Sequence, residues 1–295
     1  MSRVVYCNGR WLPISAPALP VEDRGTQFAD AVYEVIKAVD GRPRDLDRHL
    51  DRLDRSLAAI RVAWPMSRRA LNGVIGEALR RNPLRDAAIY LQVGRGVAPR
   101  YHPFPKGARP GLVVTVRRAT FPRRAELEGG VRVVTLPDER WGHCDIKTVG
   151  LLPNLLARQQ AAERGCREAW LVDRDGFVTE GTGSNAYIVD GAGRLVTRPL
   201  GPAILGGVTR SVLLELARRH GIEVIERPFR PDELPQAAEA LLSSTTSLLL
   251  PVVEVDGRPV GDGRPGPVGL MLRRLYADHL DLPDRLRWEP SPVPA

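Results

Sequence analysis

Apolar runs of strand length, separated by turns rich in glycine and proline, recur in both halves of the 295-residue chain and constrain its fold most strongly. Residues 117–130 interrupt them, because this stretch has no strand period and contains proline and a glycine pair. Before it, the leucines between residues 46 and 60 form the apolar stripe of a helix. Strands are predicted around that helix at 3–6, 33–39, 89–93 and 112–116. The pattern predicts an α+β fold with two domains.

The part of the chain after the interruption is richer in strands. They are predicted at 131–136, 168–172, 178–180, 186–189 and 195–197. Two helices, starting near Asn154 and Thr209, are expected to end at Gly165 and Gly221, because glycine suits the left-handed position past a helix end. We therefore expect a small domain over 1–118, a linker over 119–130, a larger domain over 131–284 and a disordered tail over 285–295.

Composition narrows the class of protein. Hydrophobic residues make up 43% of the chain without any run long enough to span a membrane, which is typical of a soluble globular protein. The first residues carry no signal-peptide pattern, so we expect a cytoplasmic location and no membrane partner. Three widely spaced cysteines (Cys7, Cys144 and Cys166) favour reduced thiols over a disulfide framework or a metal site.

The net charge of +8 raises the alternative of a non-catalytic basic protein that binds nucleic acid or another acidic partner. The arginines, however, are interleaved with aspartate and glutamate, as in residues 45–55. This pattern indicates a solvated helix face rather than a basic stripe. We therefore expect small-molecule chemistry and no nucleic-acid partner.

Lysine is almost absent: three lysines stand against forty arginines. Arginine stays charged, whereas a lysine can lose its proton in a buried site and attack a carbonyl carbon. Lys147 lies in a mostly apolar stretch over 141–154, where burial would lower its pKa by up to about 3–5 units. A solvated surface position is the alternative, and it explains Lys37 and Lys106 well. The sequence thus makes Lys147 the candidate nucleophile.

Two further strings could bind a phosphate. A glycine pair at 206–207 comes directly before a predicted helix, where free backbone amides and the positive helix end favour an anion. A tight loop capped by Thr209 explains the same residues. The hydroxyl run at 243–247 could add phosphate ligands, although a strand end or a serine turn explains it better when it is taken alone.

Charged side chains near two loops could face a ligand. Glu180 ends an apolar strand and is followed by small residues, which also fits an ordinary polar strand end. The glycine- and proline-rich loop over 94–105 presents Arg100 and His102 two residues apart. An arginine can grip a carboxylate with two hydrogen bonds, so this pair suits a substrate carboxylate unless its charges are incidental.

Together these strings resemble one family, the fold-type IV (class IV) pyridoxal-phosphate aminotransferases, and most closely its D-amino acid aminotransferases. The resemblance covers nearly the whole chain. It includes the strings at 22–35, 48–53, 100–102, 145–148, 179–185, 206–210 and 243–247. It implies the two-domain α+β fold, pyridoxal 5'-phosphate as cofactor and a homodimer.

The resemblance also implies a role for each matched residue. Lys147 corresponds to the Schiff-base lysine that carries the proton, and Glu180 to the partner of the pyridine nitrogen. The residues that match the phosphate cup are Arg52, Val208, Thr209, Ser244 and Thr245. Those that match the trap for the α-carboxylate in D-specific members are Tyr33, Arg100 and His102.

The implied reaction is transamination from a D-amino acid such as D-alanine to a 2-oxo acid such as 2-oxoglutarate. The alternatives within the family are an L-branched-chain or amine-directed aminotransferase and an enzyme similar to aminodeoxychorismate lyase. These share the lysine, glutamate and phosphate strings but lack a matching Arg-x-His loop. The Arg100 and His102 pair therefore favours the D-specific reaction.

Overall fold

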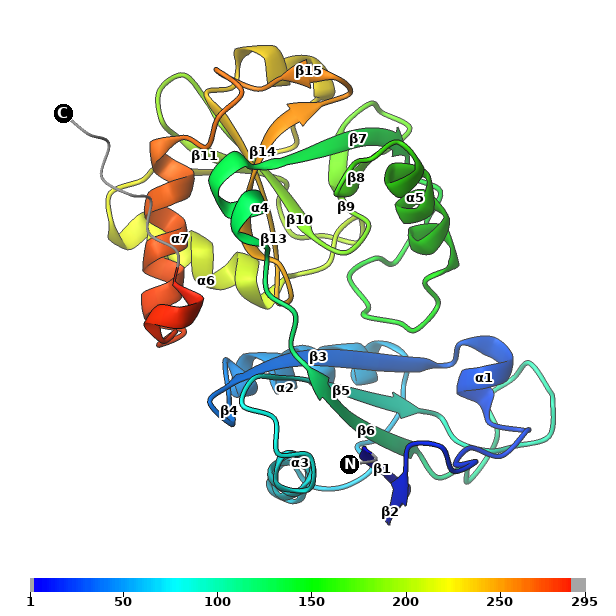
Figure 1. Cartoon of the computed structure of the whole chain (residues 1–295). Helices are drawn as coiled ribbons and strands as arrows, with labels where there is room; N and C mark the ends of the chain where they lie inside the picture. The colour runs from blue at the N-terminus through cyan, green and yellow to red at the C-terminus, as the bar shows by residue number, and fades with distance from the viewer. Residues whose placement is uncertain (1–2, 288–295) are drawn as a thin grey trace. The chain divides into compact units, whose positions relative to one another are not determined.

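The computed structural model describes residues 3–287, which form two compact units (Figure 1). Within these residues, the first unit comprises 3–120 and Ile146–Leu151, and the second comprises Phe121–Asp145 and 152–287. The short segment Ile146–Leu151 thus belongs to the first unit, although the sequence placed it inside the second domain. No helix among residues 3–287 is long and apolar enough to cross a membrane.

A six-stranded antiparallel sheet is the centre of the first unit, with the strand order β2-β1-β6-β5-β3-β4. Its strands are β1 (Val4–Cys7), β2 (Arg10–Pro13), β3 (Ala31–Val39), β4 (Arg42–Pro43), β5 (Ala87–Gly94) and β6 (Gly111–Arg118). The helices are α1 (Arg24–Phe28), α2 (Leu46–Ala59) and α3 (Arg68–Arg81).

The core of this unit forms where α2 and α3 pack against the sheet. Leu50, Leu53 and Leu57 lie three and four positions apart on α2, so they share one helix face and are fully buried. They meet Ile36 and Ile89 from the neighbouring strands β3 and β5. Burying such side chains stabilises the unit by about 1.5–3 kcal/mol each. This core fixes the position of β3, which carries several of the candidate residues.

A mixed nine-stranded sheet is the centre of the second unit, with the order β12-β11-β10-β13-β14-β7-β8-β9 and β15 paired to β14. The strands are β7 (Val131–Pro137), β8 (Glu168–Val172), β9 (Val178–Gly181), β10 (Asn185–Val189), β11 (Leu195–Thr197), β12 (Val224–Glu226), β13 (Glu239–Ser244), β14 (Leu248–Val255) and β15 (Arg258–Pro259). Among the strand pairs of residues 3–287, only β14–β7, β7–β8 and β11–β12 are parallel.

Helices pack on this sheet: α4 (Arg124–Gly129), α5 (Leu152–Glu163), α6 (Val208–Arg219) and α7 (Pro267–His279). Two short 3-10 helices, η1 (Pro231–Gln236) and η2 (Asp284–Leu286), complete the unit. Helices α6 and α7 lie side by side (Figure 1). Trp170 and Phe229 are fully buried, and their rings meet edge to face in the core.

The predicted strands and helices are confirmed, with bounds that differ by one or two residues. Gly165 and Gly221 have φ values of +68° and +77°, so they take the left-handed conformation expected past a helix end. The predicted linker at 119–130 contains helix α4, which its lack of strand period did not reveal. In the predicted tail at 285–295, η2 covers Asp284–Leu286, while residues 288–295 lie outside the described part of the chain.

Candidate active site

Lys147 lies in the segment that runs along strand β3 of the first unit. The Tyr33 amide donates a hydrogen bond to the Lys147 carbonyl at 2.9 Å, and Thr148 forms an antiparallel bridge with Val32. The Lys147 amide donates to the Ser56 hydroxyl of α2 at 3.3 Å. The backbone of Lys147 is therefore fixed from both a strand and a helix. Its side chain is half-buried, which is less enclosed than the sequence suggested.

The amine of Lys147 lies over an aromatic surface. Its Nζ atom is 4.3 Å from the centre of the Tyr33 ring, a cation–π distance. The Tyr33 ring stacks on Tyr90 of β5, with 5.5 Å between the ring centres. Burial, together with the neighbouring Tyr33, raises the pKa of Tyr90 to about 12, so this hydroxyl keeps its proton near neutral pH. Lys147 and Tyr33, which the family resemblance alone singled out, thus form one contact.

Arg52 is held by a buried carboxylate that the sequence analysis did not identify. Its Nε and Nη2 atoms donate to the two oxygens of Glu34 at 2.7 and 2.8 Å, and the Nδ1 atom of His49 lies 2.7 Å from Glu34 Oε2. All three side chains are buried. Because Glu34 is on β3 next to Tyr33, the same strand fixes Arg52 and supports Lys147. Such a fixed guanidinium can bind a phosphate with little further loss of side-chain entropy.

Glu34 is ionised by its partners in spite of its position in the core. Burial alone would raise its pKa, but the charge and hydrogen bonds of Arg52, with the hydrogen bond of His49, lower it to about 2 from 4.5. Burial lowers the pKa of His49, which favours the neutral imidazole as donor to Glu34. Glu34 and Arg52 are therefore both charged at neutral pH and form a buried ion pair.

This cluster predicts a specific acid dependence of stability. A carboxylate with a lowered folded-state pKa stabilises the fold above its unfolded pKa and loses that contribution as pH falls through the folded value. We expect the Glu34→Gln variant to be less stable than the wild type by roughly 3 kcal/mol at pH 7. The difference should shrink between about pH 4.5 and pH 2. Urea denaturation of both proteins at a series of pH values measures it.

Glu77 provides the matched control, because Arg80 and Arg81 also lower its pKa to about 2 but it lies on the solvated surface of α3. Its glutamine variant should show a much smaller difference, since solvent screens exposed ion pairs. A stability gap for Glu34→Gln that does not change between pH 7 and pH 2 would contradict this assignment.

The loop that carries Arg100 and His102 is anchored by a second charged cluster. Arg24 donates to the carbonyl oxygens of Tyr101 and His102 at 2.5 and 3.3 Å. Asp30 accepts from Arg24 at 2.8 Å and from Arg95 at 2.7 Å. The two guanidinium groups hold the pKa of Asp30 below its usual value, although burial opposes this shift. The loop thus rests on a buried arginine, a feature that the sequence analysis missed.

The side chains of Arg100 and His102 themselves are exposed and meet at the ring of Phe28. The Arg100 guanidinium lies 4.5 Å from the centre of that ring, and the His102 ring centre lies 5.5 Å from it. Two groups that can donate to a carboxylate therefore lie on one aromatic surface. Their role as a carboxylate trap stays a prediction.

Glu180 is buried in the second unit and has both carboxylate oxygens bonded. Arg140 Nη1 donates to Oε1 at 2.5 Å, and Asn185 Nδ2 donates to Oε2 at 3.0 Å. The Leu205 amide lies 3.1 Å from both oxygens. These donors fix the carboxylate plane and favour its negative charge. A fixed carboxylate of this kind is suited to accept an N–H bond from a protonated ring nitrogen.

Arg140 links Glu180 to a second carboxylate. It donates to both oxygens of Asp138, at 2.9 and 2.7 Å, and to the carbonyl of Ala203 at 3.1 Å. Burial disfavours the charge on Asp138, but the hydrogen bonds and charge of Arg140 outweigh it and lower the pKa of Asp138. The pKa of Arg140 is raised by the two carboxylates, against the effect of burial. Arg140 and Asp138 therefore form an ion pair at neutral pH, and Arg140 joins this pair to Glu180.

The predicted phosphate turn begins helix α6. Gly207 precedes Val208, and a Cβ atom at Gly207 would lie 2.1 Å from Asn185 Oδ1, so only glycine fits there. The first-turn amides of Val208 and Thr209 stand at the positive end of a 12-residue helix. The Thr209 hydroxyl lies 3.0 Å from the Tyr276 hydroxyl of α7. Asn185 therefore both donates to Glu180 and occupies the space that a side chain at position 207 would need.

The hydroxyl run lies beside this turn. Strand β13 ends at Ser244, whose hydroxyl accepts from the Ser247 amide at 2.9 Å, so the predicted strand end and serine turn are confirmed. In the register of β10 and β13, Asn185 lies opposite Ser243. This pairing brings the candidate residues Ser244 and Thr245 close to the residues around Glu180.

The candidate residues therefore fall into two groups, one in each unit. Lys147, Tyr33, Arg52 and the loop with Arg100 and His102 belong to the first unit. The second unit holds Glu180, Val208, Thr209, Ser244 and Thr245. An amine, a fixed carboxylate and a helix N-terminus are the groups that a phosphorylated pyridine aldehyde needs.

Comparison with known proteins decides the family. Residues 31–255 match the family described as "Amino-transferase class IV". The chain belongs to this family. As a class IV aminotransferase it is 41% identical over 267 residues to a D-alanine aminotransferase of Bacillus licheniformis, covering 90% of this chain and 92% of that one.

Solved structures agree with the class IV assignment. The branched-chain aminotransferase of the archaeon Thermoproteus uzoniensis, solved with norvaline, superimposes with a TM-score of 0.86. It is 26% identical, and the match covers 97% of both chains. A hypothetical aminotransferase from Mycobacterium tuberculosis, solved in its PLP-bound form, is 25% identical and superimposes with a TM-score of 0.81, covering 94% of this chain and 98% of that one. The predicted family and the predicted α+β two-domain aminotransferase fold are thus confirmed.

Several charged residues of this class IV aminotransferase escaped the sequence analysis. Arg140 and Asp138 follow directly after a predicted strand, and this position next to a strand end was a usable signal. Glu34 lies inside an apolar strand, where one carboxylate among aliphatic residues indicates a buried ion pair. Its partner Arg52 is 18 residues away, and no sequence period links them.

Proposed function

We propose that this class IV aminotransferase moves the amino group of a D-amino acid, such as D-alanine, to a 2-oxo acid such as 2-oxoglutarate. The observation that carries the proposal is the 41% identity over 90% of the chain to a D-alanine aminotransferase. Five further relatives with that name, 34–36% identical over 94% of the chain, support it. The non-catalytic basic protein considered from the +8 charge is set aside by the family match.

Pyridoxal 5'-phosphate is the cofactor of this reaction, and the chain's residues fit it. The turn at Gly207 leads into the N-terminus of α6, whose backbone amides suit a phosphate, and the Glu180 carboxylate is oriented by Arg140. When bound, the cofactor would supply an electron sink for the bond-breaking step at the α-carbon. Arg52, Val208, Thr209, Ser244 and Thr245 would hold its phosphate, and Glu180 would keep the ring nitrogen protonated.

Lys147 would both bind the cofactor and move the substrate proton. Its Nζ atom would take the proton from the substrate α-carbon and deliver it to the cofactor carbon that carries the amino group. A single amine can do this on only one face, so the anchor of the substrate carboxylate decides which enantiomer reacts. Tyr33, Arg100 and His102 would form that anchor. The exposed Arg100 and His102 side chains on the Phe28 ring support this assignment.

The alternative is an L-branched-chain aminotransferase, and a specific observation favours it. The solved neighbour from Thermoproteus uzoniensis is named a branched-chain aminotransferase and superimposes with a TM-score of 0.86. Its 26% identity is lower than the 41% shared with the D-alanine aminotransferase of Bacillus licheniformis. We therefore place the D-specific reaction first.

Absorption spectroscopy separates these reactions. The purified protein with pyridoxal phosphate should be yellow, and the band should bleach with D-alanine but not with L-leucine. The Arg100→Ala variant should keep the band but lose about 1.5–3 kcal/mol of binding to the carboxylate, a rise in KM for D-alanine of roughly tenfold or more. Bleaching by L-leucine alone would move the assignment to the branched-chain enzymes. Protein that stays colourless after incubation with the cofactor would contradict the aminotransferase proposal.

We also propose a homodimer, which the family resemblance implies. A cytoplasmic location stays a prediction from the sequence, as does the absence of nucleic-acid and membrane partners. Sedimentation of the purified protein measures whether it is a homodimer.

A further inference from the structure

A tyrosine on helix α7 contacts the turn that is proposed to hold the cofactor phosphate. The Tyr276 hydroxyl lies 3.0 Å from the Thr209 hydroxyl, in the first turn of α6. Both residues are buried, with 4% and 2% of their surfaces exposed. Two buried hydroxyls at this distance form a hydrogen bond, in which either oxygen can be the donor. Tyr276 therefore reaches the phosphate turn from a neighbouring helix.

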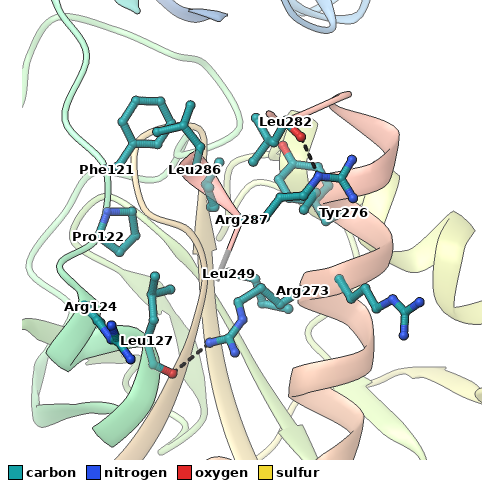
Figure 2. Close-up of a pocket in the computed structure, with 13 residues that line it drawn as sticks. Phe121, Pro122, Arg124, Leu127, Leu249, Arg273, Tyr276, Leu282, Leu286 and Arg287 are labelled. Carbon is teal, nitrogen blue, oxygen red and sulfur yellow. Dashed lines mark hydrogen bonds between the residues drawn. The ribbon is translucent and has the colours of Figure 1, made fainter. Parts of the chain in front are cut away.

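The ring of Tyr276 lies between a second aromatic ring and a cavity. It stacks on the His279 ring of the same helix, with 6.1 Å between the ring centres. It also lines a cavity of about 320 Å³, together with Leu249 and Leu282 (Figure 2). Side chains that border a cavity make fewer van der Waals contacts than those in a closed core. The hydrogen bond with Thr209 therefore contributes to fixing this ring.

The start of α7 is bonded to the strand that carries the hydroxyl run. The amides of Val268 and Gly269 donate to the two carboxylate oxygens of Glu239, each at 2.8 Å. A carboxylate at this end of a helix also interacts favourably with the helix dipole. Glu239 is the first residue of β13, and Ser244 is its last. Strand β13 thus fixes helix α7, and α7 brings Tyr276 to the turn of α6.

An anion bound at the turn would set the direction of the hydrogen bond between the two hydroxyls. The side chains of a helix lean toward its N-terminus, so the Thr209 hydroxyl lies at the end of α6 where the phosphate is expected. A threonine hydroxyl has one proton to donate and can accept from another donor. If Thr209 donates its proton to the phosphate, Tyr276 must donate to Thr209. A hydroxyl that accepts a hydrogen bond in this way is polarised and donates more strongly.

We propose that Tyr276 is a positioning residue for the cofactor, because its hydroxyl donates to Thr209 and orients the Thr209 hydroxyl toward the phosphate. This inference rests on the phosphate-binding role proposed for Thr209. Tyr276 acts through Thr209 and does not contact the cofactor. Its contribution is that of one hydrogen bond between neutral groups, which corresponds to about a two- to tenfold change in affinity.

Titration of the full-length protein, freed of cofactor, with pyridoxal phosphate tests the proposal. Tyr276→Phe should raise the Kd for pyridoxal phosphate by about two- to tenfold. Thr209→Val, which keeps the shape of the side chain, should raise it by at least as much. Adding Tyr276→Phe to Thr209→Val should cause no further rise, because Tyr276 acts through Thr209. The phosphorus NMR resonance of the bound cofactor should also shift in Tyr276→Phe, which a loss of stability alone would not cause.

Two control variants separate positioning from stability. Leu272→Val removes one buried methylene group from the same helix, so it should lower the melting temperature but leave the Kd and the phosphorus resonance unchanged. Tyr6→Phe makes the same chemical change in a buried tyrosine of the first unit and should also leave both unchanged. Circular dichroism checks that each variant is folded.

Two results would overturn the proposal. In one, Tyr276→Phe leaves both the Kd for pyridoxal phosphate and the phosphorus resonance unchanged. In the other, Tyr276→Phe has its full effect in the Thr209→Val background, so that it acts by another route. In either case, a wild type that binds the cofactor and converts D-alanine leaves the transamination proposal standing. The two proposals therefore fail by different observations.

Discussion

Replacing Lys147 with alanine is expected to reduce D-alanine transamination by at least about 10⁴-fold in kcat, because in the proposed mechanism this one side chain is both the nucleophile and the proton carrier. No arginine can replace it, since a guanidinium keeps its charge. Lys37 and Lys106 are the only other lysines in the sequence. The surface position expected for Lys37 is wrong, because its side chain is buried on β3, whereas Lys106 is exposed in a loop as expected. Steady-state production of the 2-oxo acid measures the effect.

Two variants make this result specific. Lys147→Arg keeps a positive charge near the Tyr33 ring but offers no neutral amine, so it should be as inactive as the alanine variant. Lys106→Ala, at an exposed position, should keep wild-type turnover. Both Lys147 variants should also lose the yellow band of the bound cofactor. Near-normal turnover in Lys147→Ala would remove this lysine from the mechanism.

The second large effect is expected at Arg140. Removing its guanidinium in Arg140→Met leaves the buried carboxylates of Asp138 and Glu180 without their shared cation. Breaking a buried ion pair in this way costs about 3–5 kcal/mol of stability. Urea denaturation at pH 7, with the cofactor concentration held equal, measures the loss. Cofactor affinity should fall as well, because Glu180 loses one of the donors that orient it.

Arg194→Met is the matched control, because Arg194 pairs with Asp190 at 2.8 Å in an exposed turn. An exposed pair of this kind contributes about 0.2–1 kcal/mol. The loss of unfolding free energy in Arg140→Met should also become smaller as pH falls below the ordinary range of carboxylate pKa values. Protonation then removes the unpaired charges in the variant, while the wild type loses the contribution of its ionised Asp138. Equal losses in the two variants at pH 7 would show that Arg140 is not a buried structural cation.

Local patterns predicted the elements of the fold where each pattern is complete within one element. Helix α2 has a leucine stripe on a single face, and β8 is a short apolar run, so both were found at nearly their observed bounds. Helix α3 was missed although Ser67 caps it, because two internal glycines weaken its helical pattern. Strand β14 was missed because Pro251 interrupts its apolar run and Leu248 takes a left-handed φ of +56°.

The same rule decides which residues of the candidate site could be predicted from the sequence. Lys147, Glu180 and the α6 turn stand out because a single residue type or a short string carries the chemistry. Residues that act through partners distant in sequence, such as Arg24 with the carbonyl of His102, leave no such string. Charge clusters of this kind depend on the register of strands and the packing of helices, which a single sequence does not specify.

The grouping of Ile146–Leu151 with the first unit has a consequence for dissecting the chain. The polypeptide passes between the units three times, at 120/121, 145/146 and 151/152. A cut near residue 120 therefore leaves the lysine on the C-terminal fragment, while the strand and helix that bind its backbone stay on the other. The N-terminal fragment is then an incomplete first unit without Ile146–Leu151, whereas the C-terminal fragment contains the whole second unit. Reassembly of two such fragments would report directly on how the segment with Lys147 pairs with strand β3.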